Sequence, residues 1–200
     1  MSIQLDMKEV ERQVYMFYHE DGLIDIAIGL VFVGWGLMLA IAPNGLIGLL
    51  GLGAVAIWYL GKRYLTIPRV GIIEPGRKIR NRLSGLAVFL LLLGLATFVG
   101  ILLAVLGGDD FLADHSLGLL GLVIALGIGV GGYVLRANRL YAYATLLFVA
   151  FAGGEALNST VTSFDAFLLS VILAGAVILF SGLVVLARFL RKYPLPALEG

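Results

Sequence analysis

The chain has 200 residues, of which 60% are hydrophobic, and its mean hydropathy is +1.03. Soluble globular domains contain about 45 to 50% apolar residues, so this composition excludes an ordinary soluble domain and indicates a polytopic helical membrane protein. The absence of Cys excludes disulfides, thiol nucleophiles and Cys-based metal sites. The net charge of +1 says little as a total, because a membrane sorts charges by side, and we expect no nucleic-acid partner.

Residues 1–21 have the pattern of an amphipathic helix. Apolar residues recur there at spacings of three and four, with charged residues between them. These apolar residues are Ile3, Met7, Val10, Val14 and Phe17. Five acids and two bases give the segment a net charge of −3, which suits a basic protein surface better than anionic lipid. We predict a cytoplasmic surface helix that is either an interfacial anchor or a docking helix for a partner chain or the protein's own loop.

Residues 22–200 contain six apolar runs, each near the roughly 20 residues that a helix needs to cross about 30 Å of hydrocarbon. The runs are Leu23–Ala42, Leu46–Leu60, Leu83–Leu106, Leu117–Leu135, Leu140–Leu157 and Phe164–Leu186. We therefore predict an all-α fold of six transmembrane helices in three hairpins. Each of the fourteen Lys and Arg residues lies either before the first run or directly after the second, fourth or sixth run. The other three connections contain no Lys or Arg. The positive-inside rule then places both termini in the cytoplasm, and we assign the chain to a prokaryotic cytoplasmic membrane.

A polar cluster precedes and enters the first run. Its members are Tyr15, Tyr18, His19, Glu20, Asp21 and Asp25. The carboxylates and the imidazole of His19, Glu20, Asp21 and Asp25 could perform acid–base chemistry. The structural alternative is favoured, because Asp21 before Gly22 suits a helix cap and Asp25 would benefit from the dipole of the first turn. The chain contains no G-x-S-x-G, H-E-x-x-H or Walker motif, and no catalytic residue is assigned.

The segment 62–82 carries seven bases and one acid and is the only long basic connection. Its β-prone stretches Tyr64–Ile67 and Val70–Ile73, followed by the turn Glu74–Arg77, predict a small hairpin or folded-back loop. The bases either fix topology alone or also bind the phosphate of lipid headgroups or another anion. The candidates for such binding are Arg69, Arg77, Lys78 and Arg80. The loop also complements the charge of the acidic N-terminal helix.

Residues 107–115 read GGDDFLADH and contain three carboxylates and one His. These are suitable ligands for a divalent metal, but no recognised spacing is present, so a solvated acidic turn that caps the fourth helix is favoured. We expect no metal and no other cofactor. Thr162, with Asp165 three residues later, resembles a cap at the start of the sixth helix, and Ser163 is another acceptable cap.

Glycine makes up 27 residues and is concentrated inside the predicted helices. Gly45, Gly48 and Gly51 near the second run, and Gly118, Gly121 and Gly129 with Ala125 in the fourth, would form grooves for close helix packing. Gly48–Leu52 and Gly118–Leu122 have the same sequence, which hints at repeated two-helix units.

The run Tyr18–Asp25, with Ile67–Gly71 downstream, resembles a pattern found in uncharacterised prokaryotic multi-pass membrane proteins. The resemblance covers about the first 80 residues and implies no activity. It implies that Glu20, Asp21, Asp25 and Arg69 form one feature on the cytoplasmic face.

Three functions remain open at this stage. No charge falls near the middle of a predicted span, which disfavours an ion path or proton relay. The leading hypothesis is a non-enzymatic accessory or scaffold protein, acting as a homo-oligomer or with a partner membrane protein. The alternatives are a small transporter or channel subunit for neutral or apolar substrates, and a protein that binds or modifies membrane lipids at the cytoplasmic face. A polar cavity in mid-membrane would favour transport, and a pocket joining the acids to Arg69 would favour lipid chemistry.

Overall fold

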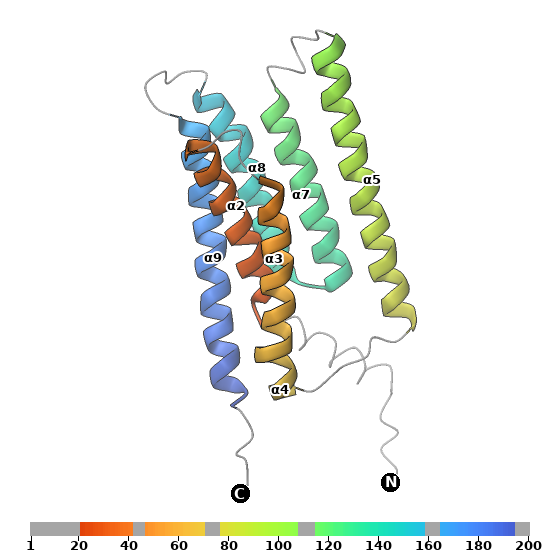
Figure 1. Ribbon diagram of the computed structural model, residues 1–200, viewed down its shortest axis with the longest axis vertical. Coiled ribbons are helices and arrows are strands. Elements are labelled where there is room, and N and C mark those ends of the chain that lie inside the picture. Colours follow the sequence, from red (N-terminus) through yellow and green to blue (C-terminus); the bar gives the residue numbers. More distant parts are fainter. Residues whose placement is uncertain (1–20, 42–46, 71–76, 108–114, 159–164, 195–200) are drawn as a thin grey trace, which may run out of the picture.

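The computed structural model describes residues 21–41, 47–70, 77–107, 115–158 and 165–194, which form an all-helical bundle (Figure 1). The helices are α2 (Leu23–Ile41), α3 (Ile47–Gly61), η1 (Lys62–Thr66), α4 (Ile67–Val70), α5 (Arg77–Gly107), α7 (Ser116–Leu135), α8 (Asn138–Asn158) and α9 (Ala166–Lys192). The all-α prediction is confirmed for this part of the chain, which contains no strand. The predicted N-terminal helix lies, apart from Asp21, outside the described residues.

Five helices are long and apolar enough to cross a membrane: α2, α7, α8, α9 and the part of α5 from residue 80 to 100. Each coincides with an apolar run identified in the sequence, as expected of a membrane protein. The second run is also helical, but α3 alone has 15 residues and rises about 22 Å, less than the ~30 Å of a hydrocarbon core. Its helical path continues without interruption through η1 and α4 to Val70.

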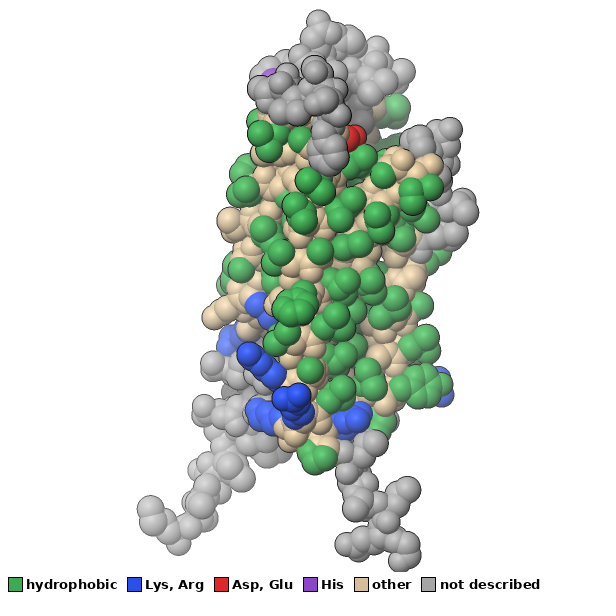
Figure 2. Space-filling model, turned by 90° about the vertical axis from the view of Figure 1, so that its left-hand side faces the viewer, with side chains coloured by type: hydrophobic (Ala, Val, Ile, Leu, Met, Phe, Trp, Pro, Cys, Tyr) green, Lys and Arg blue, Asp and Glu red, His purple; other side chains and the backbone are tan. Residues whose placement is uncertain are grey.

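Successive helices run in opposite directions along the long axis of the bundle (Figure 1). As a result α4, the start of α5, the turn between α7 and α8, and the end of α9 all lie at one end. Lys and Arg side chains gather at this end of the visible face (Figure 2), and we call it the basic end. The alternation of basic and base-free connections in the sequence thus becomes a separation of charge between the two ends of the fold.

The segment that follows α3 is helical as far as Val70, which corrects the prediction of a β-prone stretch at Tyr64–Ile67. η1 is a π-helix, and the Ile67 N–H at its end bonds to the carbonyl oxygen of Lys62, five residues back. This wide turn lies directly before Pro68, whose ring would clash with the preceding turn of a regular α-helix. The helix can therefore continue through the proline. The β propensity of Tyr64–Ile67 is overridden by this context.

The other half of the basic segment is only partly described. The predicted strand Val70–Ile73 and the turn Glu74–Arg77 fall largely in residues 71–76, which lie outside the described residues. Arg77 begins α5, and Arg80 lies in its first turn. In its described parts the segment therefore consists of two helix ends.

The first and last helices of the described chain, α2 and α9, make the most extensive helix contact of the bundle. Glycines spaced seven residues apart line it on both sides. They are Gly22, Gly29 and Gly36 at and before α2, and Gly175 and Gly182 on α9. A methyl group at Gly29 would lie 2.5 Å from the backbone nitrogen of Leu179, and one at Gly182 would lie 2.7 Å from that of Ile26. Such small residues let two backbones approach, which brings more atoms into van der Waals contact.

The glycines singled out in the sequence behave differently. Gly118 and Gly121 do face α8, and a methyl group at Gly121 would collide with the ring of Phe151. Gly51 and Gly129 instead face open space. Gly45 lies outside the described residues, and the surroundings of Gly48 are not described.

The core between α2, α8 and α9 is centred on Phe151, which is fully buried. Its ring meets those of Phe32 and Phe167 edge to face, with centroids 6.1 and 5.4 Å away. Trp35 lies 5.5 Å from the same ring at a tilted angle. Pairs of this geometry add about 0.5 to 1.5 kcal/mol each beyond burial, so they reinforce the contacts among the three helices.

We predict that Gly29→Ala destabilises the protein, because the added methyl would meet backbone atoms of α9 that cannot rotate away. Overpacking of this kind costs roughly 1 to 3 kcal/mol. The matched control is Gly51→Ala on α3, where a methyl group meets no atom within 4 Å. Thermal unfolding in mild detergent should show a lower midpoint for Gly29→Ala and an unchanged or higher midpoint for the control. Equal midpoints would contradict the close α2–α9 contact.

Candidate functional site

Buried charged groups gather near the basic end of the bundle. Among the described residues, the buried polar side chains are Asp21, Asp25, Lys62 and Thr66. Together with Arg139 they form what we call the polar cluster. They come from the start of α2, from η1 and from the first turn of α8. The cluster therefore ties together three helical segments that are distant in sequence.

Asp21 is fully buried and has three partners. Its Oδ2 lies 2.6 Å from Nζ of Lys62 and accepts a hydrogen bond of 2.6 Å from the Thr66 hydroxyl. Its Oδ1 accepts from the Leu23 N–H at 3.2 Å, which satisfies one of the open donors at the start of α2. The capping role expected of Asp21 is therefore present, and the ion pair with η1 is added to it.

Lys62 and Thr66 meet Asp21 because both lie on one face of the helical path, four residues apart. The side chain of Lys62 is only 4% exposed. A buried ammonium or carboxylate is unfavourable unless an opposite charge lies close to it, and Asp21 and Lys62 supply this for each other. The two groups therefore depend on each other to stay charged.

Asp25, one turn further along α2, is also fully buried and pairs with α8. Its Oδ2 lies 3.0 Å from Nε of Arg139, although the N–H does not point well at the oxygen. The attraction is thus mainly that of two charges in a poorly solvated place. Tyr143, one turn along α8, adjoins the same carboxylate and lies 2.9 Å from the Ser181 hydroxyl of α9.

The turn between α7 and α8 places Arg139. Arg136 has a left-handed backbone, with φ 54°, and the Ala137 N–H bonds to the Gly132 carbonyl at 3.0 Å. This is the Schellman pattern of a helix end, here formed without glycine at the left-handed position. α8 then begins at Asn138, so Arg139 lies in its first turn, level with Asp25.

The interactions of the polar cluster hold helices together. It pairs two acids with two bases, and the Thr66 hydroxyl is engaged by Asp21. Replacing such pairs by apolar groups is often neutral, but removing one partner leaves a buried charge and costs about 3 to 5 kcal/mol. A general acid or base must reach a substrate, and both carboxylates are fully buried against internal partners.

The residues predicted from the sequence are distributed as follows. Asp21 and Asp25 lie in the polar cluster. Arg69 is half-buried, and its Nη1 donates to the Leu65 carbonyl at 2.8 Å. It makes no ion pair or hydrogen bond with Asp21 or Asp25. Arg80 is exposed on α5.

The side chains of the other four predicted residues are not described by the structure. His19 and Glu20 lie outside the described residues. Arg77 and Lys78 open α5, and their side chains are not described. Sequence reasoning had assigned no site role to Lys62 as an individual residue, to Thr66 or to Arg139. Lys62 and Thr66 are four residues apart, which puts them on one face only if the segment is helical, and the sequence did not predict a helix there.

At the opposite end, the start of α7 is capped by α8. The Glu155 carboxylate accepts from the N–H groups of Leu117 and Gly118, at 3.1 and 3.0 Å. His115 occupies the cap position itself without a side-chain bond to the helix N–H groups. The three acids of the turn that was expected to cap this helix fall in the part of the chain that is not described. Residues 108–114 lie outside the described residues. No group of three possible metal ligands occurs within the described ranges.

The start of α9 differs slightly from the prediction. Asp165 is itself the cap, and its carboxylate accepts from the Leu168 N–H at 3.1 Å. Thr162 and Ser163, which were expected to fill that role, lie outside the described residues. A carboxylate near the positive end of the helix dipole is present, as predicted.

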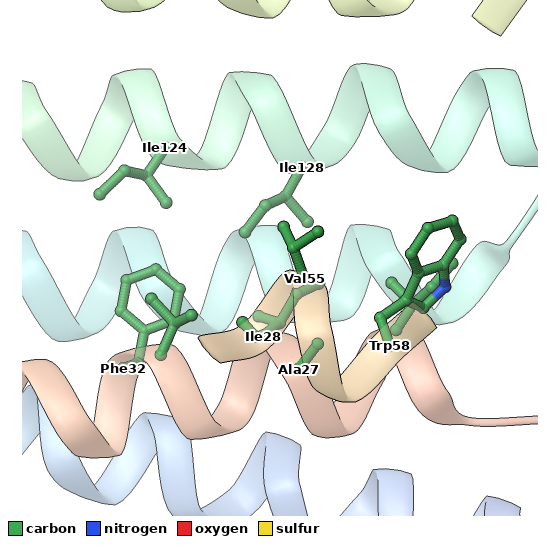
Figure 3. A pocket seen from close by; sticks show the side chains of 10 residues that line it. Ala27, Ile28, Phe32, Val55, Trp58, Ile124 and Ile128 are labelled. Atoms are coloured by element: carbon green, nitrogen blue, oxygen red, sulfur yellow. The ribbon is translucent and has the colours of Figure 1, made fainter. Parts of the chain in front are cut away.

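An apolar groove lies along the other side of α2, facing α3, α5 and α7. It contains two adjoining cavities of about 420 and 370 Å³. Four isoleucines line both cavities: Ile24, Ile28, Ile124 and Ile128. Figure 3 shows Val55 and Trp58 of α3 across the first cavity from the isoleucines of α7. We call these two cavities the side groove.

Searches of protein-family models, of curated proteins and of solved structures found no match to the chain. The geometry of the polar cluster and the side groove is therefore the basis for a functional proposal.

We predict that Asp21 and Lys62 are energetically coupled. Asp21→Asn or Lys62→Met alone should cost about 3 to 5 kcal/mol, because each leaves one buried charge without its partner. The double variant should cost clearly less than the sum, since both charges are then gone. Arg63→Met, at the exposed neighbouring position, is the control for loss of positive charge. Unfolding of the four variants in detergent checks this, and strictly additive costs would contradict the pair.

Proposed function

We propose that the protein is a non-enzymatic membrane scaffold or accessory protein that associates with a second copy of itself through α5. The observation that carries the proposal is the isolation of α5. Within its 21-residue apolar stretch no residue is buried, and among the described helices its substantial contact is with α7.

Isolation matters because lipid tails are as apolar as Leu, so no hydrophobic effect presses helices together inside a bilayer. Van der Waals packing must do so, and α5 obtains little of it from α7 alone. Its exposed residues include a seam with spacings of three and four. The seam consists of Val88, Leu91, Leu95, Phe98 and Leu102. A second copy presents the same seam, so one contact would satisfy both chains symmetrically.

The alternatives have less support. A lipid-modifying enzyme would need accessible acids, whereas Asp21 and Asp25 are buried in ion pairs. The cavities of the side groove have apolar walls, which disfavours a path for polar substrates. The absence of charge near the middle of the spans points the same way. A transporter or channel subunit for neutral or apolar substrates stays the second candidate.

We further propose six spans with both termini in the cytoplasm of a prokaryotic cell. The alternating helix directions and the gathering of Lys and Arg at one end support this orientation, because positively charged connections stay in the cytoplasm. The second span would be α3 together with the start of the π-helical turn. The acidic segment 1–21 would then lie on the same side as the basic end, where its charge is complementary.

This topology predicts the accessibility of single cysteines, which the Cys-free chain allows without background. Cysteines at Asn44, Asp110 and Ser159 should react with a membrane-impermeant maleimide added to intact cells. Cysteines at Ser2, Gly76 and Gly200 should react only after the membrane is opened. The reverse pattern would invert the orientation, and labelling of Gly76 together with Asn44 from outside would remove the second span.

Self-association predicts a periodic pattern of cross-links. Single cysteines scanned along the α5 seam should form disulfide-linked dimers in membranes under mild oxidation, strongest at one or two positions of that face. Val177 and Phe180 of α9 are also exposed and serve as controls that should stay monomeric. Native mass spectrometry should show the dimer without cross-linking. Equal cross-linking on α5 and α9, or a monomer throughout, would contradict the proposal.

A further inference from the structure

The side groove is a continuous apolar space that the protein itself leaves unfilled. Gly94 of α5 and Gly131 of α7 line its second cavity, and a methyl group at either would meet no atom within 4 Å. The other walls are Leu, Ile, Val, Ala and aromatic side chains. Water does not fill an apolar cavity, because it needs polar partners there. The natural occupant is a hydrocarbon.

The size of each cavity suits a small ligand such as one lipid chain. Both volumes fall in the range of about 300 to 1,000 Å³ that is typical of sites for small ligands.

One end of the groove reaches the basic end of the bundle. Leu86 of α5 and Leu135 of α7 line the second cavity. Arg82 lies one turn before Leu86, Arg136 directly follows Leu135, and both arginines are exposed. In the first cavity Trp58 lies one turn before Lys62, and its indole N–H is buried without an acceptor among the described residues. Hydrogen-bond donors and positive charge therefore mark this end.

Charge is in surplus at the basic end. Asp21 and Asp25 are the acids described there, and both are paired with Lys62 and Arg139. The remaining bases whose side chains are described there are Arg63, Arg69, Arg80, Arg82, Arg136, Arg188, Arg191 and Lys192. An anion is the complementary partner, and an arginine can bind a phosphate through two parallel hydrogen bonds.

We propose that the side groove binds an anionic glycerophospholipid, with an acyl chain between α3, α5 and α7 and the phosphate between Arg82 and Arg136. This site uses the α7-facing side of α5, and it does not depend on self-association through the outward seam of that helix. It also differs from the headgroup site expected at Arg69, Arg77, Lys78 and Arg80.

The first test fills the groove. Gly94→Leu/Gly131→Leu places two side chains in the cavity, whereas Gly100→Leu/Gly129→Leu adds them on the same two helices where no atom lies within 4 Å and outside the cavity lining. Each protein is reconstituted in vesicles of equal phosphatidylglycerol and phosphatidylcholine, extracted in mild detergent at low salt, and analysed by native mass spectrometry. Wild type and control should retain phosphatidylglycerol, and the filled variant should lose it. Retention by the filled variant would overturn the proposal.

The second test removes the charge. Arg82→Gln/Arg136→Asn keeps the left-handed position acceptable, because Asn tolerates that backbone conformation. Two lost arginines should reduce the preference for phosphatidylglycerol over phosphatidylcholine about 30-fold. Arg188→Gln/Arg191→Asn on α9, which does not line the groove, should leave the preference unchanged. An unchanged preference in the Arg82/Arg136 variant would overturn the phosphate site. If that variant instead changed the fraction of dimer and not the bound lipid, the groove would be a contact for a second copy of the chain.

Discussion

The close contact between α2 and α9 is the constraint on which the rest of the structure depends. It joins the first and last described helices, and only glycine at five positions spaced by seven residues permits it. At Gly182 the α9 backbone lies against Asp25, so this contact excludes water from that side of the carboxylate. The burial that makes Asp25 need a charged partner is therefore a consequence of helix packing.

The polar cluster then determines how the remaining helices meet this pair. A buried charge is unfavourable unless it is paired. The favoured arrangement of η1 and α8 is therefore one that brings a base of each against Asp21 and Asp25. Lys62 is at the required position because α3 continues without a break into the π-helical turn that Lys62 begins. Arg139 is there because the left-handed residue Arg136 makes the preceding turn short. Alternative registers of these helices would leave a charge unpaired in a poorly solvated place.

The sequence was sufficient for the features that depend on composition along one helix. Apolar runs located the five described helices that are long and apolar enough to cross a membrane, and the spacing of Lys and Arg anticipated the basic end, because both signals are local. Asp21 could be recognised as a cap from its neighbour Gly22. The bases that pair with Asp21 and Asp25 could not be predicted, because the prediction requires knowing which helices contact each other. The β-prone stretch Tyr64–Ile67 also predicted a hairpin or folded-back loop where a widened helical turn places Lys62 and Thr66 four residues apart on one face.

The same packing logic explains why a groove remains beside the bundle. Glycines and edge-to-face aromatic contacts hold α2, α8 and α9 together. α7 packs on them because Gly121 admits Phe151 and Glu155 binds the first N–H groups of α7. α5 has no equivalent anchor among the described residues and touches α7 through leucines such as Leu90 against Gly127. Bulky side chains on α5 hold its backbone away from α2, and Gly94 leaves the intervening space empty. In a bilayer such a space is filled by lipid at little cost, since a lipid tail replaces the missing side-chain contacts.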